Sequence, residues 1–114
     1  MNLFVYGTLM RSENGPMSRR LHARARWLGG DACLGELYDL GAYPALIMPG
    51  ATWVSGELVD VDDADLVWLD AYEGFEYSRQ FCLLHSGLQA WVYVYVAPLP
   101  EAARHLSSGC WLEL

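Results

Sequence analysis

Two short segments of the chain hold residue types whose spacing suits chemistry. The sequence Tyr6-Gly7-Thr8-Leu9 directly follows an apolar segment, and Asp70-Ala71-Tyr72-Glu73-Gly74 ends a segment with helical character. The first segment can form a loop of exposed backbone amides, which is a structure that binds a carboxylate or a phosphate. The second places one carboxylate, Glu73, at a helix end. Together they predict proton-transfer chemistry on a small anionic molecule.

Glu73 occupies a position that local electrostatics disfavours. A helix C-terminus carries partial negative charge and favours a cation there by roughly 0.3–1 kcal/mol, yet Asp70 and Glu73 stand at this end. Both the helix dipole and the neighbouring Asp70 raise the pKa of a carboxyl group, and nearby aromatic residues add desolvation. A raised pKa suits a general base or acid near neutral pH. The alternative interpretation is a solvent-exposed glutamate at a frayed helix end.

The glycine loop and Arg79 each have a structural and a functional interpretation. Gly7 permits a positive φ angle and a close approach of the backbone to a ligand, although a Gly-Thr turn often only connects two elements. Arg79 stands two residues after Tyr77 and has three candidate partners, which are Glu73, Asp70 and the carboxylate of a substrate. Of these, a structural ion pair is the favoured interpretation.

Composition narrows the class of partner. The length of 114 residues suits a single domain over residues 1–114, and a hydrophobic fraction of 54% is ample for one core. The formal net charge of −7 argues against a nucleic acid and disfavours an anionic membrane. A negative ligand must therefore be held by local donors and not by the overall field.

Other kinds of site find little support in the sequence. The three cysteines are widely spaced without a CxxC motif, the three histidines form no metal-binding spacing, and no Gly-x-Ser-x-Gly motif is present. We therefore expect no metal site and no serine nucleophile. The start of the chain lacks a basic flank, and no apolar run approaches about 20 residues. We expect a reduced protein of the cytoplasm.

The segments that must position these residues are mostly strands. Alternating or apolar runs predict strands at residues 2–6, 53–61, 77–85 and 89–97, and residues 27–40 mix strand signals with glycines. The last two runs are expected to pair around the turn at residues 86–88, with the 89–97 strand central because both of its faces are apolar. Strands with one or two helices predict an α+β domain with a curved or barrel-like sheet.

One helix is predicted before Gly74, which is a natural C-terminal cap. Asp62 is the predicted N-cap, and the acidic residues that follow suit the first turn. The predicted buried stripe consists of Ala64, Val67, Trp68, Ala71 and Tyr72.

The ordered set of motifs resembles a known family. It consists of Phe4-Val5-Tyr6-Gly7-Thr8-Leu9, then residues 37–46 with Tyr43-Pro44, then Leu69-Asp70-Ala71-Tyr72-Glu73-Gly74 with Tyr77 and Arg79, then Trp91-Val92-Tyr93-Val94-Tyr95. In this order, and over nearly the whole chain, the set resembles the gamma-glutamylcyclotransferase-like superfamily, including its short bacterial and AIG2-like members. The resemblance implies a small mixed-sheet, barrel-like fold with one or two helices packed outside. It also implies one cavity shared by the Tyr-Gly-Thr-Leu loop and the Glu of Tyr-Glu-Gly.

The resemblance further implies a reaction and residue roles. In that family the α-amine of a small γ-glutamyl substrate attacks its own γ-carbonyl, which releases 5-oxoproline and a free amine or amino acid without a cofactor. The resemblance implies that Glu73, which matches the Glu of the family's Tyr-Glu-Gly motif, is the catalytic base. The implied substrate-binding residues are Tyr6, Gly7, Thr8, Leu9, Tyr77 and Arg79.

Several questions stay open at this point. The released group is an amino acid, an amine or a biosynthetic intermediate, and the chain is expected to act as a monomer or weak homodimer. Two other functions compete with the cyclotransferase, which is an acyltransferase or lyase by reaction type. One is a non-catalytic domain of the same fold that binds a small molecule or peptide, and the other is an amidohydrolase that uses the same Glu to activate water.

Overall fold

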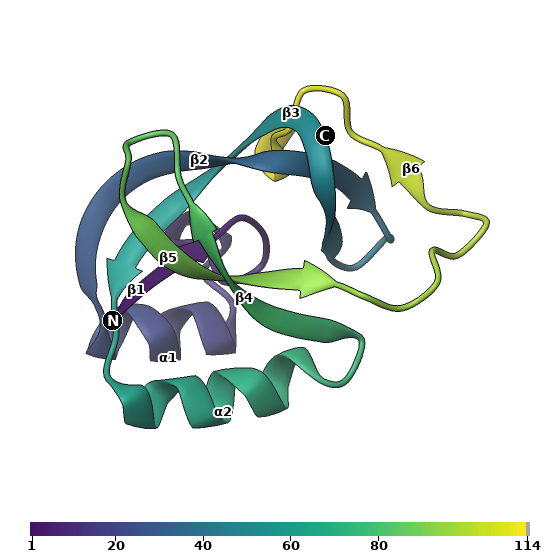
Figure 1. The fold of residues 1–114 in the computed structure, drawn as a ribbon. Helices are drawn as coiled ribbons and strands as arrows, with labels where there is room; N and C mark the ends of the chain where they lie inside the picture. The colour runs from purple at the N-terminus through teal and green to yellow at the C-terminus, as the bar shows by residue number, and fades with distance from the viewer. Residues whose placement is uncertain (114) are drawn as a thin grey trace.

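A short strand, β1 (Asn2–Val5), lies inside a six-stranded sheet in the computed structural model, which describes residues 1–113 (Figure 1). The strand order is β4-β5-β1-β3-β2-β6. The remaining strands are β2 (Arg26–Asp39), β3 (Pro44–Asp60), β4 (Tyr77–Leu83), β5 (Gln89–Tyr95) and β6 (Arg104–His105). β1 pairs in parallel with β5, whereas all other neighbouring strands are antiparallel. The sheet is therefore mixed, as predicted.

The sheet curves into a half-barrel because its longest hairpin bends. β2 and β3 pair over most of their length, with register shifts at Trp27/Gly29 and at Gly35/Glu36. Figure 1 shows these two strands arching over the rest of the sheet. A Cβ atom on Gly56 would lie 2.4 Å from the backbone oxygen of Val5, so only glycine allows β3 to approach β1 this closely.

Two helices lie together on one side of the sheet, below it in Figure 1. They are α1 (Pro16–Arg24) and α2 (Asp63–Glu73), and short 3₁₀ turns occur at η1 (Arg11–Glu13) and η2 (Trp111–Glu113). Arg24 of α1 forms an ion pair with the buried Asp65 of α2, and the indole of Trp68 donates a 3.0 Å hydrogen bond to the same carboxylate. This buried, satisfied carboxylate joins the two helices.

The predicted buried stripe of α2 was wrong. Val67 and Tyr72 are 72% and 41% exposed, whereas Asp65, Leu66 and Leu69 are buried. The buried face carries a carboxylate that Arg24 neutralises and Trp68 hydrogen-bonds, so a pattern of apolar residues alone cannot identify it. The predicted boundaries were better, because the helix follows Asp62 and is capped by Gly74 at a φ of 78°.

Most strand predictions are confirmed, with one error of length. β4 and β5 form the predicted hairpin, and β5 lies between two other strands. β3 begins at Pro44 and not near residue 53, because Pro49 and Gly50 interrupt the strand pattern that its first half would otherwise show.

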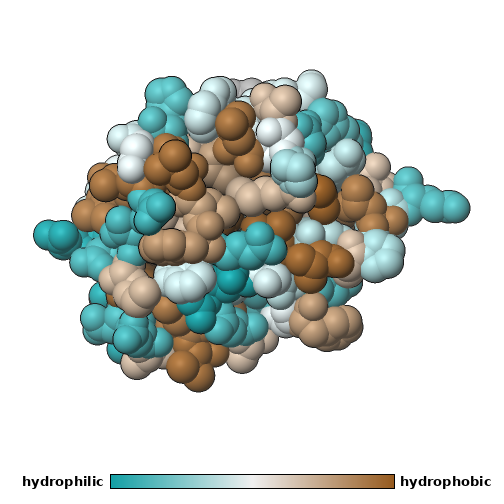
Figure 2. Space-filling model, viewed as in Figure 1, coloured by the Kyte–Doolittle hydropathy of each residue, from teal (hydrophilic) through white to brown (hydrophobic). Residues whose placement is uncertain are grey.

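The core fills the space between the sheet and the helices. Its fully buried side chains include Leu3, Phe4, Leu21, Leu37 and Leu69. On the face drawn in Figure 2, apolar and polar side chains form small interspersed patches. Within residues 1–113, no helix is both long and apolar enough to cross a membrane.

Candidate active site

A cavity opens between the end of β1, the start of β3 and the end of α2. Its inner part encloses about 340 Å³, some of it open to solvent, and an outer part adjoins it because Thr8, Tyr43, Glu73 and Tyr77 line both. The residues that line only the inner part are Phe4, Val5, Tyr6, Gly7, Leu9, Pro44 and Tyr93. We refer to these two parts as the inner cavity and the outer mouth.

Glu73 reaches the cavity because of its place on α2. It lies one turn after the fully buried Leu69 and two turns after the buried Leu66, so it shares their inward face. Burial raises the pKa of Glu73 to about 7. The carboxyl group therefore titrates near neutral pH, which suits a group that both accepts and returns a proton.

The predicted contribution of Asp70 to this shift was wrong. Arg79 donates hydrogen bonds of 2.9 and 3.2 Å to the two carboxylate oxygens of Asp70, and the Tyr93 hydroxyl donates a third at 2.7 Å. Burial opposes ionisation of Asp70, but these donors lower its pKa overall. The charge of Asp70 is thus neutralised locally, and burial remains the cause of the raised pKa of Glu73.

The structure accordingly places Arg79 outside the inner cavity and the outer mouth. Its guanidinium stacks on the Trp91 ring at 4.4 Å, and the side chain lines a neighbouring surface hollow together with Asp70 and Phe75. Of the three partners considered for Arg79, the structure favours Asp70 in a structural ion pair.

The glycine loop lines the inner cavity. The N–H of Met10 donates a 2.9 Å hydrogen bond to the carbonyl of Gly7, which closes the loop into a turn. Within residues 1–113, no hydrogen bond uses the N–H groups of Gly7, Thr8 or Leu9, and all three residues line the inner cavity. Three successive unpaired amides beside a cavity form a potential anion site.

Gly7 does not use the positive φ angle that its residue type permits. Its φ angle is not positive, so conformational freedom does not explain the glycine. Instead, a Cβ atom at this position would lie 2.5 Å from Cγ and 2.8 Å from Cδ of the Pro44 ring. The loop and the start of β3 therefore meet only because position 7 has no side chain.

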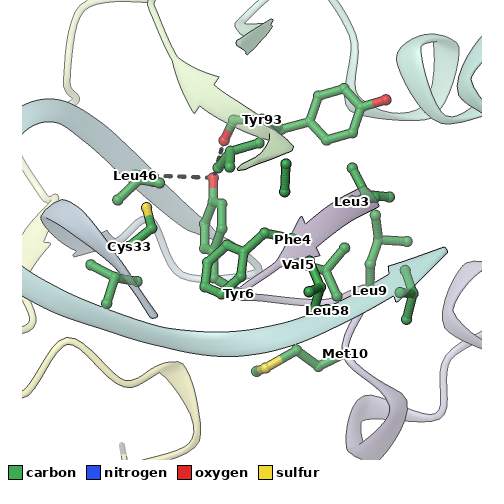
Figure 3. Close-up of a cluster of buried hydrophobic side chains, with 14 of the residues drawn as sticks. Leu3, Phe4, Val5, Tyr6, Leu9, Met10, Cys33, Leu46, Leu58 and Tyr93 are labelled. Atoms are coloured by element: carbon green, nitrogen blue, oxygen red, sulfur yellow. Dashed lines mark hydrogen bonds between the residues drawn. The ribbon is translucent and has the colours of Figure 1, made fainter. Parts of the chain in front are cut away.

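Tyr6, the residue before the glycine loop, is fixed by two hydrogen bonds. Its buried hydroxyl donates a 2.6 Å hydrogen bond to the carbonyl of Tyr93 and accepts one of 3.3 Å from the N–H of Leu46, as Figure 3 shows. Burial raises the pKa of Tyr6, and the charge of Glu73 adds to this effect, so the hydroxyl stays protonated. Tyr6 thus connects the end of β1 to β5 and β3 at the residue where the glycine loop begins.

Tyr77 forms a wall of both parts of the site. Its hydroxyl donates a 2.8 Å hydrogen bond to the carbonyl of Pro44, and its ring packs edge-on against Tyr95 at 5.3 Å. Because the phenol group is committed to Pro44, Tyr77 fixes the start of β3 against the start of β4. The site therefore depends on contacts among four separate segments of the chain.

The cavity brings together six of the seven residues expected from the sequence: Tyr6, Gly7, Thr8, Leu9, Glu73 and Tyr77. Arg79 is the seventh, and it lines the neighbouring surface hollow instead. The sequence reasoning did not identify Tyr43, Pro44, Glu76 or Tyr93 as lining residues. The Tyr43-Pro44 pair was visible as part of a motif and could have indicated the first two, whereas no local signal pointed to Glu76.

The chain is similar to known proteins over almost its whole length. The family model described as "Gamma-glutamyl cyclotransferase, AIG2-like" matches residues 3–113. The chain is 38% identical to the gamma-glutamylcyclotransferase family protein ytfP of Citrobacter rodentium, over 99% of this chain and 96% of that protein.

Two solved structures are also similar. The solution structure of protein ytfP from Escherichia coli has a TM-score of 0.77 and 36% identity, covering 99% of this chain and 97% of that one. The AIG2-like protein of Mus musculus has a TM-score of 0.73 and 25% identity, covering 99% and 82% of the two chains. The chain belongs to the AIG2-like gamma-glutamyl cyclotransferase family.

Proposed function

We propose that this chain is a γ-glutamyl cyclotransferase that converts a small γ-glutamyl compound into 5-oxoproline and a free amine or amino acid. The observation that carries the proposal is the placement of Glu73, with its pKa of about 7, in the same cavity as three unpaired amides. Membership of the family supports the same reaction.

The first step of the proposed reaction is a proton transfer. The ionised Glu73 carboxylate takes a proton from the α-ammonium group of the substrate, which leaves a neutral amine with a free lone pair. The buried position of the carboxylate favours this transfer, because burial disfavours its charged form and so strengthens it as a base.

Ring closure follows. The amine nitrogen attacks the γ-carbonyl carbon of the same molecule, and a new C–N bond forms as the carbonyl oxygen becomes an oxyanion. When the carbonyl re-forms, the original C–N bond breaks as protonated Glu73 gives its proton to the leaving amine. The ring nitrogen then gives its extra proton to the freed Glu73 carboxylate, which passes it to the departing amine. The carboxylate is regenerated, and the products are 5-oxoproline and the free amine.

The loop supplies positioning. We propose that the N–H groups of Gly7, Thr8 and Leu9 bind the glutamyl moiety. The hydrogen bonds of Tyr6 and Tyr77 hold the loop and the start of β3 in place around it. Holding the chain of the substrate in a folded conformation supplies much of the rate effect, since a five-membered ring then closes within one molecule. The reaction needs no cofactor. We further propose that the chain works in the cytoplasm, as a monomer or weak homodimer.

The proposal is tested by incubating the protein with a panel of γ-glutamyl amino acids and γ-glutamyl amines and measuring 5-oxoproline. Formation of 5-oxoproline with an equal amount of free amine supports the cyclotransferase. Release of free glutamate would instead indicate the amidohydrolase, and saturable binding without any product would indicate the non-catalytic domain.

A further inference from the structure

The outer mouth has an unusual charge environment for a site that takes an acidic substrate. Glu73 and Glu76 are the two charged residues that line it, and the other lining residues are Thr8, Ala42, Tyr43, Tyr72 and Tyr77. The chain has seven Lys and Arg residues in total, all of them arginines, and none lines the inner cavity or the outer mouth. The local field at the entrance is therefore negative.

Arginines elsewhere are already committed to other groups. Arg24, Arg26, Arg79 and Arg104 form ion pairs with aspartates, and Arg11 and Arg20 stack on the rings of Trp27 and Trp68. Across residues 1–113, no ion pair includes the carboxylate of Glu76. No cationic side chain in this part of the chain therefore neutralises its charge.

Glu76 is held in a defined place. Its backbone carbonyl accepts a 2.8 Å hydrogen bond from Val96, which anchors the residue just before β4. Burial and then the Glu76 carboxylate raise the pKa of Tyr95, so the carboxylate lies beside that phenol. The half-buried Glu76 therefore lines the outer mouth, with its carboxylate close to the Tyr95 ring.

Two aromatic side chains at the mouth complement this charge. Tyr43 and Tyr72 are 40% and 41% exposed, and Tyr72 is linked to the glycine loop by a 3.2 Å hydrogen bond between its hydroxyl and that of Thr8. The faces of exposed tyrosine rings attract cations, with energies that rise as the cation is desolvated. A carboxylate and two exposed tyrosine rings that line one mouth form a chemical environment that favours an ammonium group.

We infer that the outer mouth holds the leaving portion of the substrate, and that Glu76 together with Tyr43 and Tyr72 selects a leaving amine with a second, positively charged amino group. This inference rests on the proposed function, in which the glutamyl moiety fills the inner cavity. In this proposal a substrate chain that extends from Glu73 continues into the outer mouth, since Glu73 lines both parts. A leaving group that ends in a carboxylate would meet Glu76 and be disfavoured.

The test uses three γ-glutamyl amides that differ only at the far end. Each has the same amide and a four-methylene spacer, which ends in an ammonium, a methyl or a carboxylate group. For the wild-type protein we expect kcat/KM to be about tenfold higher for the ammonium compound than for the methyl compound, and lowest for the carboxylate compound. Glu76→Gln should remove most of the difference between the ammonium and methyl compounds.

Controls separate this inference from the proposed function. Glu101→Gln removes the same charge from an exposed position outside the site, and should leave the preference unchanged. Equal kcat/KM for the ammonium and methyl compounds, or a preference that survives Glu76→Gln, would overturn the inference while leaving the cyclotransferase intact. If no compound yields 5-oxoproline, the proposed function fails. The order of Kd values for the three compounds on Glu73→Gln protein then decides the inference, because a charge-selective mouth binds the ammonium compound most tightly and an unselective one binds all three alike.

Discussion

The Pro44 ring packs so closely against Gly7 that a Cβ atom at position 7 would lie 2.5 Å from the Pro44 Cγ. Pro44 is buried, and its carbonyl is held by the Tyr77 hydroxyl at 2.8 Å, so the ring has little freedom to move away. This contact fixes the distance between the amide loop and the opposite wall of the cavity.

Gly7→Ala should therefore impair ligand binding. The added methyl group must displace either Pro44 or the loop, and we expect KM for a γ-glutamyl substrate to rise about tenfold or more, because small misplacements of positioning groups are costly. Steady-state kinetics with circular dichroism as a check on folding provide the measurement. Gly30→Ala is the control, since a Cβ there makes only an ordinary 3.7 Å contact. A folded Gly7→Ala protein with unchanged KM would remove the loop from the proposed site.

The pKa of Glu73 predicts a specific dependence of stability on pH. The folded-state pKa of about 7 lies above the ordinary value of 4.5, so the folded state binds more protons than the unfolded state between these values. Burial of the Glu73 carboxyl group therefore does not lower the free energy of unfolding at pH 4. As the pH rises from about 4.5 to 7, the free energy of unfolding falls, and the full loss is reached near pH 8. The difference of about 2.5 pKa units corresponds to at most roughly 3–4 kcal/mol.

Glu73→Gln should consequently be more stable than the wild type at pH 8 and equally stable at pH 4. Urea unfolding of both proteins across this range measures the difference directly. Using the difference between the two proteins cancels the contributions of the other carboxyl groups. A difference that stays constant from pH 4 to pH 8 would mean that the carboxyl group is not buried enough to shift its pKa.

The acid limb of the pH–rate profile should report Glu73 alone. The base must be ionised, so kcat/KM should fall below an apparent pKa of about 7. Asp70→Asn should leave this limb in place, because Arg79 already neutralises the Asp70 charge and Tyr93 donates a hydrogen bond to it. The same variant should lower the free energy of unfolding by no more than about 1 kcal/mol, since the Asp70–Arg79 pair is partly exposed. A shift of the limb to lower pH in Asp70→Asn would show that the Asp70 charge does act on Glu73.

The sequence predicted the fold well because its strongest signals are local. Alternating residues at 89–95 and the turn at 86–88 determine a hairpin without reference to the rest of the chain. The buried face of α2 was missed because Asp65 is neutralised by Arg24, which lies 41 residues earlier. Long-range charge pairing of this kind leaves no trace in the local apolar pattern.

The candidate site shows the same division. Glu73 stands out in the sequence because an acidic residue is disfavoured at a helix C-terminus. The glycine loop stands out because a glycine directly follows an apolar strand. Glu76 does not depart from any local rule, and it gains significance only because the topology brings Tyr43 to the mouth that Glu76 also lines. The reason for Gly7 was likewise inaccessible, because Pro44 is distant in sequence and close in space.

The central claim is that Glu73 is the proton-transferring group, and Glu73→Gln tests it most directly. The amide is nearly isosteric but cannot accept the ammonium proton, so 5-oxoproline formation from a γ-glutamyl substrate should fall by about 10²–10⁴-fold at pH 8. Because the variant is expected to be at least as stable as the wild type, unfolding would not explain the loss, and Glu101→Gln should retain full activity. Near wild-type 5-oxoproline formation by folded Glu73→Gln protein would contradict the account.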